Sequence, residues 1–225
     1  MADPDHQAWA FARLDRPDRV RTAGRVGDER AWSTSKVLVV AGYLQSRVGG
    51  DPGRIPAADR RLIRAALTRS DEDAVVAVRA RIVGRPGTVI TRVLRSVGDR
   101  ETVAPDRYQG LMRWSLREQV RFAAALDAGR VVSPTASRWL LDQLRPVPEH
   151  RWGLGRIGAT AFKGGWLRAD TATRQVGLVD GWAVAISTDA GPVRRQTDGD
   201  DAHVTGMDAL ARRLASRLDW ERRCR

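Results

Sequence analysis

Lysine is almost absent from this chain, and that scarcity limits where an amine can act as a base. Of the 39 basic residues only two are lysines, Lys36 and Lys163, and the others are arginines. An arginine keeps its proton in proteins, whereas a lysine loses it once burial or a nearby cation lowers its pKa. A sequence that favours arginine is expected to keep lysine where a base or a proton relay is required. Two lysines that survive by chance are the alternative.

The first lysine lies beside a serine at the start of an apolar segment. The sequence reads Trp-Ser-Thr-Ser-Lys over 32–36 and is almost wholly apolar over 37–44, which predicts a buried helix with Ser33 in its first turn. Residues three apart share a helix face, so we expect the Ser33 hydroxyl to meet the Lys36 amine. The helix amino terminus also favours developing negative charge there. The alternative is that Ser33 only caps the helix.

The second lysine lies in a predicted strand. Short residues alternate over 159–163 and lead into Gly164 and Gly165, which is typical of a strand that another backbone approaches closely. Two further apolar stretches, 174–179 and 182–188, are joined by Asp-Gly and predict a hairpin. An exposed strand lysine at position 163 is the alternative.

A Ser-Asp-Glu sequence at 70–72 separates two predicted helices, 57–67 and 73–83. Taken alone, Ser70 and Asp73 fit a variant of the capping box, in which the side chains satisfy the amide groups of the second helix. Two more helices are predicted over 115–127, opened by a second capping box, and from 133 to a stop before 146.

Taken in order, the three motifs resemble those of class A serine β-lactamases and penicillin-binding proteins, which share Ser-x-x-Lys, Ser-Asp-x and Lys-x-Gly. The resemblance covers nearly the whole chain. It implies an α+β, β-lactamase/DD-peptidase-like fold, in which an antiparallel sheet flanked by helices is joined to an all-helical subdomain. Residues 1–44 and 149–225 would form the α/β subdomain, and residues 45–148 the helical one. The site would lie between them.

The resemblance also implies roles for individual residues. Ser33 would be the nucleophile that forms an acyl-enzyme, Lys36 its base and Ser70 a proton relay. Lys163 would bind a substrate carboxylate and help to keep Lys36 neutral. Substrate would further meet Glu72, Gly165 and Trp166, with the backbone amides of Ser33 and Trp166 as the oxyanion hole. The implied substrates are small molecules or peptides, either β-lactams or peptidoglycan stem peptides.

Three departures from the family pattern bear on activity. Glu72 replaces the usual asparagine, and Gly164 replaces the usual threonine or serine. The chain contains no asparagine, so the loop expected over 98–114 cannot supply the family's pair of a water-activating glutamate and an asparagine; Glu101 is a poor candidate for the base. We therefore expect weak or no turnover of β-lactams. Because Glu72 places negative charge in the site, a catalytically degenerate binding module is the alternative.

Length, composition and net charge exclude few other kinds of protein. A chain of 225 residues, 42% hydrophobic, is long enough for one core or two interlocked ones. The net charge of +12 first suggests nucleic acid, but the arginines are spread along the chain among carboxylates, without a basic block, so no specific nucleic-acid role is expected.

No cofactor or metal is expected, because the three histidines have no zinc-ligand spacing and a single cysteine stands in a charged tail. The sequence shows neither a signal peptide nor an apolar run of about 20 residues, so the chain as given is expected to be neither exported nor membrane-spanning. The family resemblance instead implies an extracytoplasmic location if the start is trimmed.

Overall fold

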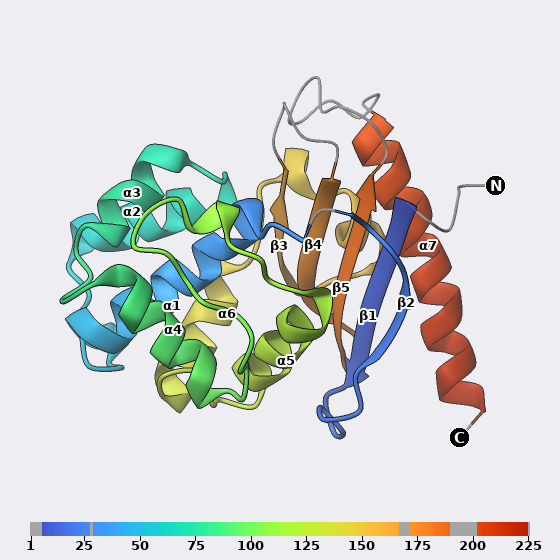
Figure 1. The fold of residues 1–225 in the computed structure, drawn as a ribbon, viewed down its shortest axis with the longest axis horizontal. Coiled ribbons are helices and arrows are strands. Elements are labelled where there is room, and N and C mark those ends of the chain that lie inside the picture. Colours follow the sequence, from blue (N-terminus) through green and yellow to red (C-terminus); the bar gives the residue numbers. More distant parts are fainter. Residues whose placement is uncertain (1–5, 28, 167–171, 190–201, 225) are drawn as a thin grey trace.

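The computed structural model describes residues 6–27, 29–166, 172–189 and 202–224. Within these residues, helices gather on one side of an antiparallel sheet, and one long helix covers the other side (Figure 1). The sheet has the strand order β2-β1-β5-β4-β3. Its strands are β1 (Gln7–Arg13), β2 (Arg21–Gly24), β3 (Ala161–Gly165), β4 (Ala172–Val179) and β5 (Trp182–Asp189). The α+β architecture that the sequence predicted is therefore confirmed.

Both faces of the central strands are buried, and alternation along the strand decides what each face carries. On β5, Ala183 and Ala185 join the core formed with α5 (Leu116–Asp127), whereas Val184 and Ile186 pack towards α7 (Ala202–Arg223). Side chains alternate between faces with a period of two, so small residues on one side let α5 lie close to the sheet. The same alternation places Lys163, which pairs in register with Val176, on the α5 side of the sheet.

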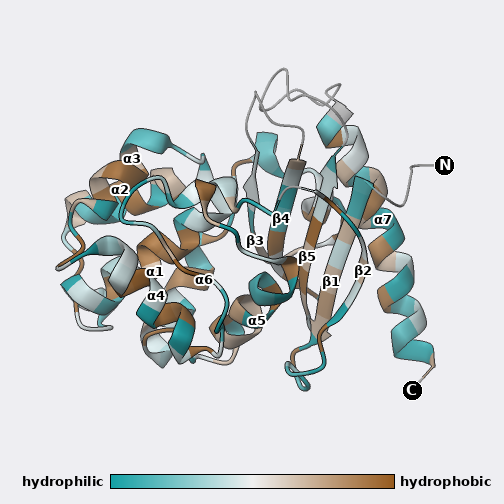
Figure 2. Cartoon of the chain, in the orientation of Figure 1, coloured by the Kyte–Doolittle hydropathy of each residue, from teal (hydrophilic) through white to brown (hydrophobic). Residues whose placement is uncertain are grey.

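The remaining helices build a separate apolar core beside the sheet (Figure 1). Its centre is the amino-terminal part of α1, where every residue from Lys36 to Leu44 is buried; Figure 2 shows the hydrophobic colour along this helix. A helix that is apolar all round must be enclosed by others. The helices that enclose α1 (Lys36–Arg47) are α2 (Ala57–Thr68), α3 (Glu72–Arg79), α4 (Pro86–Ser96) and α6 (Pro134–Gln143).

Most predicted elements are confirmed, with three differences at the helices. The sequence pattern did not reveal α4, and α3 ends at Arg79 rather than at residue 83. The capping box proposed for Ser70 and Asp73 is wrong, because Asp71 caps α3 by accepting a hydrogen bond from the Ala74 amide at 2.9 Å. The division of the chain at residues 44 and 149 into two subdomains stays a prediction. No helix among the described residues is both long and apolar enough to cross a membrane.

Candidate active site

Ser33 lies in a short 3₁₀ turn, Trp32–Ser35, that leads directly into α1. A 3₁₀ turn has three residues per turn, so the side chains of Ser33 and Lys36 stand on one face. The Lys36 Nζ lies 3.0 Å from the Ser33 Oγ, as the spacing predicted. Neither the turn nor α1 has a side-chain cap, so Ser33 does not act as the cap that was the alternative.

The Lys36 amine is enclosed by oxygen atoms. Besides Ser33, its Nζ contacts the Ser70 carbonyl oxygen at 2.6 Å, the Ser70 Oγ at 3.3 Å and the Glu72 Oε2 at 2.9 Å. Burial lowers the pKa of Lys36, and the carboxylate of Glu72 opposes that effect. Two opposing effects therefore act on the Lys36 amine. Burial favours its neutral form, and the carboxylate of Glu72 favours its protonated form.

Ser70 joins the two lysines. It lies between α2 and α3 with φ of 60°, in the left-handed region that non-glycine residues seldom adopt. Its Oγ lies 3.3 Å from the Lys36 Nζ and 2.9 Å from the Lys163 Nζ. The unusual backbone turns the hydroxyl into the site instead of onto the amides of α3.

Lys163 reaches the same hydroxyl from β3 on the opposite side. Only 3% of the residue is exposed, and its Nζ also donates to the Gly164 carbonyl oxygen at 2.7 Å. Burial first, and then the nearby Lys36 cation, lowers the pKa of Lys163 well below its usual value. The alternative of an exposed strand lysine is therefore wrong. Four polar side chains separated by up to 130 positions form one hydrogen-bonded chain, Ser33–Lys36–Ser70–Lys163.

A cavity of about 260 Å³ opens onto Ser33 and Lys36, whereas Ser70 and Lys163 are not among its lining residues. Its lining combines polar groups around Ser33 and Lys36 with aromatic and aliphatic walls. The lining residues are Trp32, Ser33, Ser35, Lys36, Val39, Glu72, Val75, Arg79, Tyr108, Gln109, Gly110, Leu111 and Trp166. A concave, mainly apolar pocket with a few convergent polar groups is typical of a small-molecule site.

Gly165 lies where β3 passes the Trp32–Ser35 turn that carries Ser33. A Cβ at this position would stand 2.9 Å from the Ser33 amide nitrogen and 2.8 Å from the Thr34 amide nitrogen, which is closer than real contacts allow. Only glycine permits this approach. Gly164 faces a side chain instead, because its Cβ would stand 2.8 Å from the Trp166 ring. The glycine at 165 thus sets how close the strand comes to Ser33.

The loop between α4 and α5 walls the pocket, but with residues that the sequence did not single out. Tyr108, Gln109 and Leu111 line the cavity, and Gln109 meets Arg79 with 3.3 Å between Oε1 and Nη1. No sequence motif marks these residues, since the loop lacks periodicity. A backbone hydrogen bond from Ala31 to the Met112 oxygen at 2.9 Å fastens the loop beside the nucleophile's turn.

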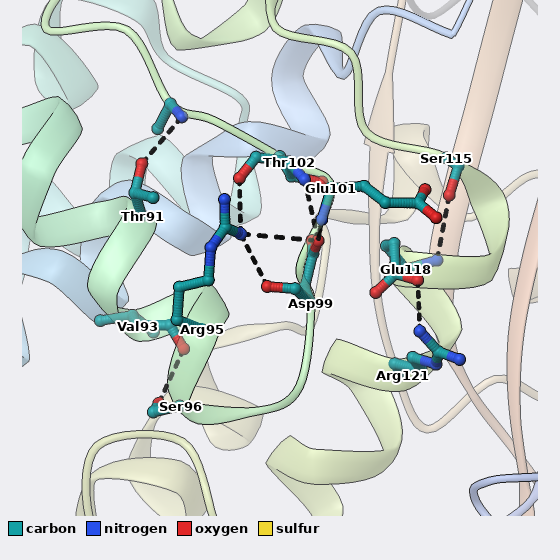
Figure 3. Close-up of polar contacts among 11 residues, drawn as sticks. Thr91, Val93, Arg95, Ser96, Asp99, Glu101, Thr102, Ser115, Glu118 and Arg121 are labelled. Carbon is teal, nitrogen blue, oxygen red and sulfur yellow. Dashed lines mark hydrogen bonds and ion pairs between the residues drawn. The ribbon is translucent and has the colours of Figure 1, made fainter.

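Glu101, the poor candidate for a base, lies elsewhere. It lines a second cavity with Glu29 and Arg113, and Figure 3 shows its carboxylate extending towards Ser115 at the start of α5. The loop residues around it are held by Asp99, whose Oδ1 accepts from the amides at 101 and 102 (Figure 3). Glu101 does not line the Ser33 pocket, so a role as its water-activating base is not supported.

A histidine missed by the sequence analysis borders the site. The ring of His150 packs edge-on against Trp166 with 5.3 Å between centroids, and burial and the Lys163 cation lower the pKa of His150. Its position after α6 gave no signal in the sequence. Within the described residues, no three His, Cys, Asp or Glu side chains cluster as metal ligands.

At the level of sequence, no protein-family profile and no curated protein matches the chain. The fold is nevertheless similar to that of known structures over nearly its whole length. PBP-A superposes with a TM-score of 0.70 at 19% identity, covering 97% of this chain and 92% of PBP-A. The chain therefore has a serine β-lactamase-like fold, as the three motifs predicted.

Two β-lactamases superpose about as well. The chromosome-encoded β-lactamase of Vibrio parahaemolyticus gives a TM-score of 0.69 at 16% identity, covering 94% of this chain and 93% of that enzyme. The β-lactamase from Sphaerobacter thermophilus gives 0.66 at 18% identity, covering 93% and 91%. Identities this low establish the fold, while the chemistry must be argued from this chain's own side chains.

Proposed function

We propose that this chain is a serine hydrolase that forms an acyl-enzyme at Ser33 with amide or ester substrates. The observation that carries the proposal is the continuous contact Ser33–Lys36–Ser70–Lys163, of which Ser33 and Lys36 line a pocket. A serine becomes a nucleophile when an adjacent base takes its proton, and a buried lysine with a lowered pKa can serve as that base.

Acylation follows from the contacts. The lone pair of the neutral Lys36 amine takes the Ser33 hydroxyl proton while Oγ adds to the substrate carbonyl carbon, and the C=O electron pair moves to oxygen. The backbone amides of Ser33 and Trp166 are proposed to hold this oxyanion, and losing one such donor typically costs about 100- to 1000-fold in rate. When the oxyanion collapses and the C–N bond breaks, Ser70 gives its proton to the leaving nitrogen and regains one from Lys36.

Lys163 and the pocket walls are proposed to place the substrate. An anionic substrate group beside Lys163 would raise the pKa of this buried amine and so favour the cation that binds it. Gly165 lets the substrate lie along β3 close to Ser33. The proposed substrates are β-lactams or peptidoglycan stem peptides. In support, a PBP-A variant of similar fold (TM-score 0.67, 18% identity, covering 95% of this chain and 90% of that one) is an acyl-enzyme complex with penicillin-G.

Release of the acyl group is proposed to be slow. Among the loop residues that line the pocket, Gln109 carries an amide that cannot accept a proton from water, and Glu101 faces a different cavity. A β-lactam would then label the protein and remain attached.

Labelling with a fluorescent penicillin tests this function. We expect one covalent adduct by intact-protein mass spectrometry and a labelled peptide that contains Ser33. Ser33→Ala should abolish the adduct. Ser216→Ala should leave it unchanged, because this serine lies on α7, where its hydroxyl donates to the Arg212 oxygen of the same helix. Equal labelling of wild type and Ser33→Ala, or no labelling at all, would contradict the proposal.

A binding module without catalysis is the second candidate, and the Lys36–Glu72 ion pair favours it. A carboxylate 2.9 Å from the base stabilises the ammonium form, which cannot take a proton from Ser33. This candidate predicts reversible binding of a penicillin, measurable by calorimetry, with no covalent adduct at any pH.

A further inference from the structure

The pocket holds one acidic side chain among its described lining residues, and it belongs to Glu72. Glu72 stands in the first turn of α3, its side chain is 75% exposed, and its Oε2 contacts the Lys36 Nζ. Its carboxylate therefore faces both solvent and the base of the proposed reaction. It is no more than two hydrogen-bond lengths from the Ser33 hydroxyl, at the place where an acyl group would enter.

The oxygen contacts of Lys36 favour its protonated form. Its Nζ has four oxygen atoms within 3.3 Å, from Ser33, twice from Ser70, and from Glu72. An ammonium group offers three donors to such a shell, whereas a neutral amine offers two and needs its lone pair for the serine proton. Glu72 thus raises the pKa of a base that burial otherwise lowers. Anything that gives Glu72 another cationic partner favours the active, neutral amine.

We propose that Glu72 is a specificity-determining residue that favours acyl donors whose acylamino side chain carries a positive charge. This inference rests on the proposed acyl-enzyme function. An ammonium group on the substrate pairs with the Glu72 carboxylate and weakens its hold on Lys36, which releases its proton to water and then accepts that of Ser33. The aromatic and aliphatic walls at Trp32, Val75 and Leu111 suit an apolar body behind the charge. The substrate class is therefore an acyl donor with an apolar acylamino side chain that carries an amine next to the carbonyl of its amide.

An uncharged acyl group gains nothing from Glu72. The carbonyl oxygen of the side-chain amide would meet the Glu72 carboxylate, which accepts hydrogen bonds and donates none. An asparagine side chain at this position would donate one. Glu72 hence discriminates in both directions, attracting a cation and disfavouring a neutral acceptor.

Two penicillins that differ only by one amino group test this directly. Aminobenzylpenicillin carries an α-amino group on its acyl side chain, and benzylpenicillin has hydrogen there. The second-order rate of Ser33 acylation is measured for both by mass spectrometry, at a pH below about 7, where an α-amino group is protonated. We expect the amino compound to react about 1.4- to fivefold faster, the range for a solvent-accessible ion pair.

The decisive variant is Glu72→Gln, which keeps the side-chain shape and removes the charge. The rate ratio between the two penicillins should fall to about one. Asp73→Asn is the matched control, because it removes a second carboxylate from the same first turn of α3 without touching the pocket, and its ratio should equal that of wild type.

Other outcomes overturn the inference and separate it from the function beneath it. If both penicillins label Ser33 at equal rates in wild type, or if Glu72→Gln keeps the wild-type ratio, the selectivity is refuted and the acyl-enzyme proposal stands. If Glu72→Gln slows only the release of the acyl group, Glu72 activates water and does not select substrates. If neither penicillin labels Ser33, both proposals fail.

Discussion

Replacing Gly165 by alanine measures how closely β3 must pass the nucleophile's turn. The added Cβ would lie 2.8 Å from the Thr34 nitrogen, 2.9 Å from the Ser33 nitrogen and 3.0 Å from the Ala31 oxygen. All three are backbone atoms, so no side chain can rotate away. Ordinary contact begins near 3.4 Å, and strand and turn must therefore separate by about 0.5 Å. Overpacking of this kind costs about 2 kcal/mol in free energy of unfolding, or roughly 4 to 8 °C in Tm for a chain of this size.

The same displacement moves the Ser33 amide and hydroxyl away from a substrate held along β3. Misplacement of reacting groups by about 1 Å can cost 100-fold in rate, so we expect acylation by a fluorescent penicillin to fall at least tenfold in Gly165→Ala. Thermal unfolding and labelling rate are measured together. Gly27→Ala is the control, because its Cβ would meet nothing within 4 Å and should change neither quantity. A Gly165→Ala protein with wild-type Tm and labelling rate would refute the close-approach argument.

Three further substitutions probe other parts of the structure. Gln109→Glu places a carboxylate on the pocket wall, and we expect release of a bound penicilloyl group to speed up by at least tenfold, followed as recovery of free protein by mass spectrometry; unchanged release would contradict a role for this wall in slow turnover. Burial and then Asp99 raise the pKa of Glu118, so the stability that Glu118 contributes is present below its unfolded pKa of about 4.3 and is lost as pH rises through its pKa in the folded protein. Glu118→Gln should flatten the resulting fall in the free energy of unfolding between pH 4 and 8, measured by urea unfolding. An unchanged slope of this free energy against pH would count against the prediction. Tyr43→Phe removes the buried hydroxyl that donates to the Asp59 Oδ2 at 2.7 Å and should lower the free energy of unfolding by about 2 kcal/mol, whereas a loss below about 0.5 kcal/mol would show that this bond is dispensable.

Local patterns in the sequence were enough for much of the fold. The apolar run after Lys36 specified a buried helix, and the Asp-Gly pair between two apolar stretches specified the β4–β5 hairpin. The N-cap predicted at Ser115 is also confirmed, since its side chain accepts from the Glu118 amide, while the Glu118 carboxylate pairs with Arg121. Each of these signals depends on residues within one turn or one hairpin, where spacing alone fixes the neighbours. The helix α4 escaped notice although its apolar face is buried.

Motif order predicted which residues belong to the candidate site, but not how they touch. The spacing of three between Ser33 and Lys36 fixes their contact wherever that segment turns, so this part was determined locally. The meeting of Lys163 with Ser70 depends on sheet alternation, which turns position 163 towards the helices, and on the left-handed backbone of Ser70, which no pattern announced. The capping interpretation of Ser70 failed for that reason.

The sequence by itself therefore determined most of the helices and strands, the Ser33–Lys36 pair and the presence of a carboxylate at position 72. Only the tertiary structure decided that Glu72 contacts Lys36, that Gln109 and not Glu101 faces the pocket, and that Gly165 lies against the turn of Ser33. Short-range spacing is set by backbone geometry, which every helix and strand shares. Contacts between distant segments depend on how whole layers pack, and no window of sequence contains that information.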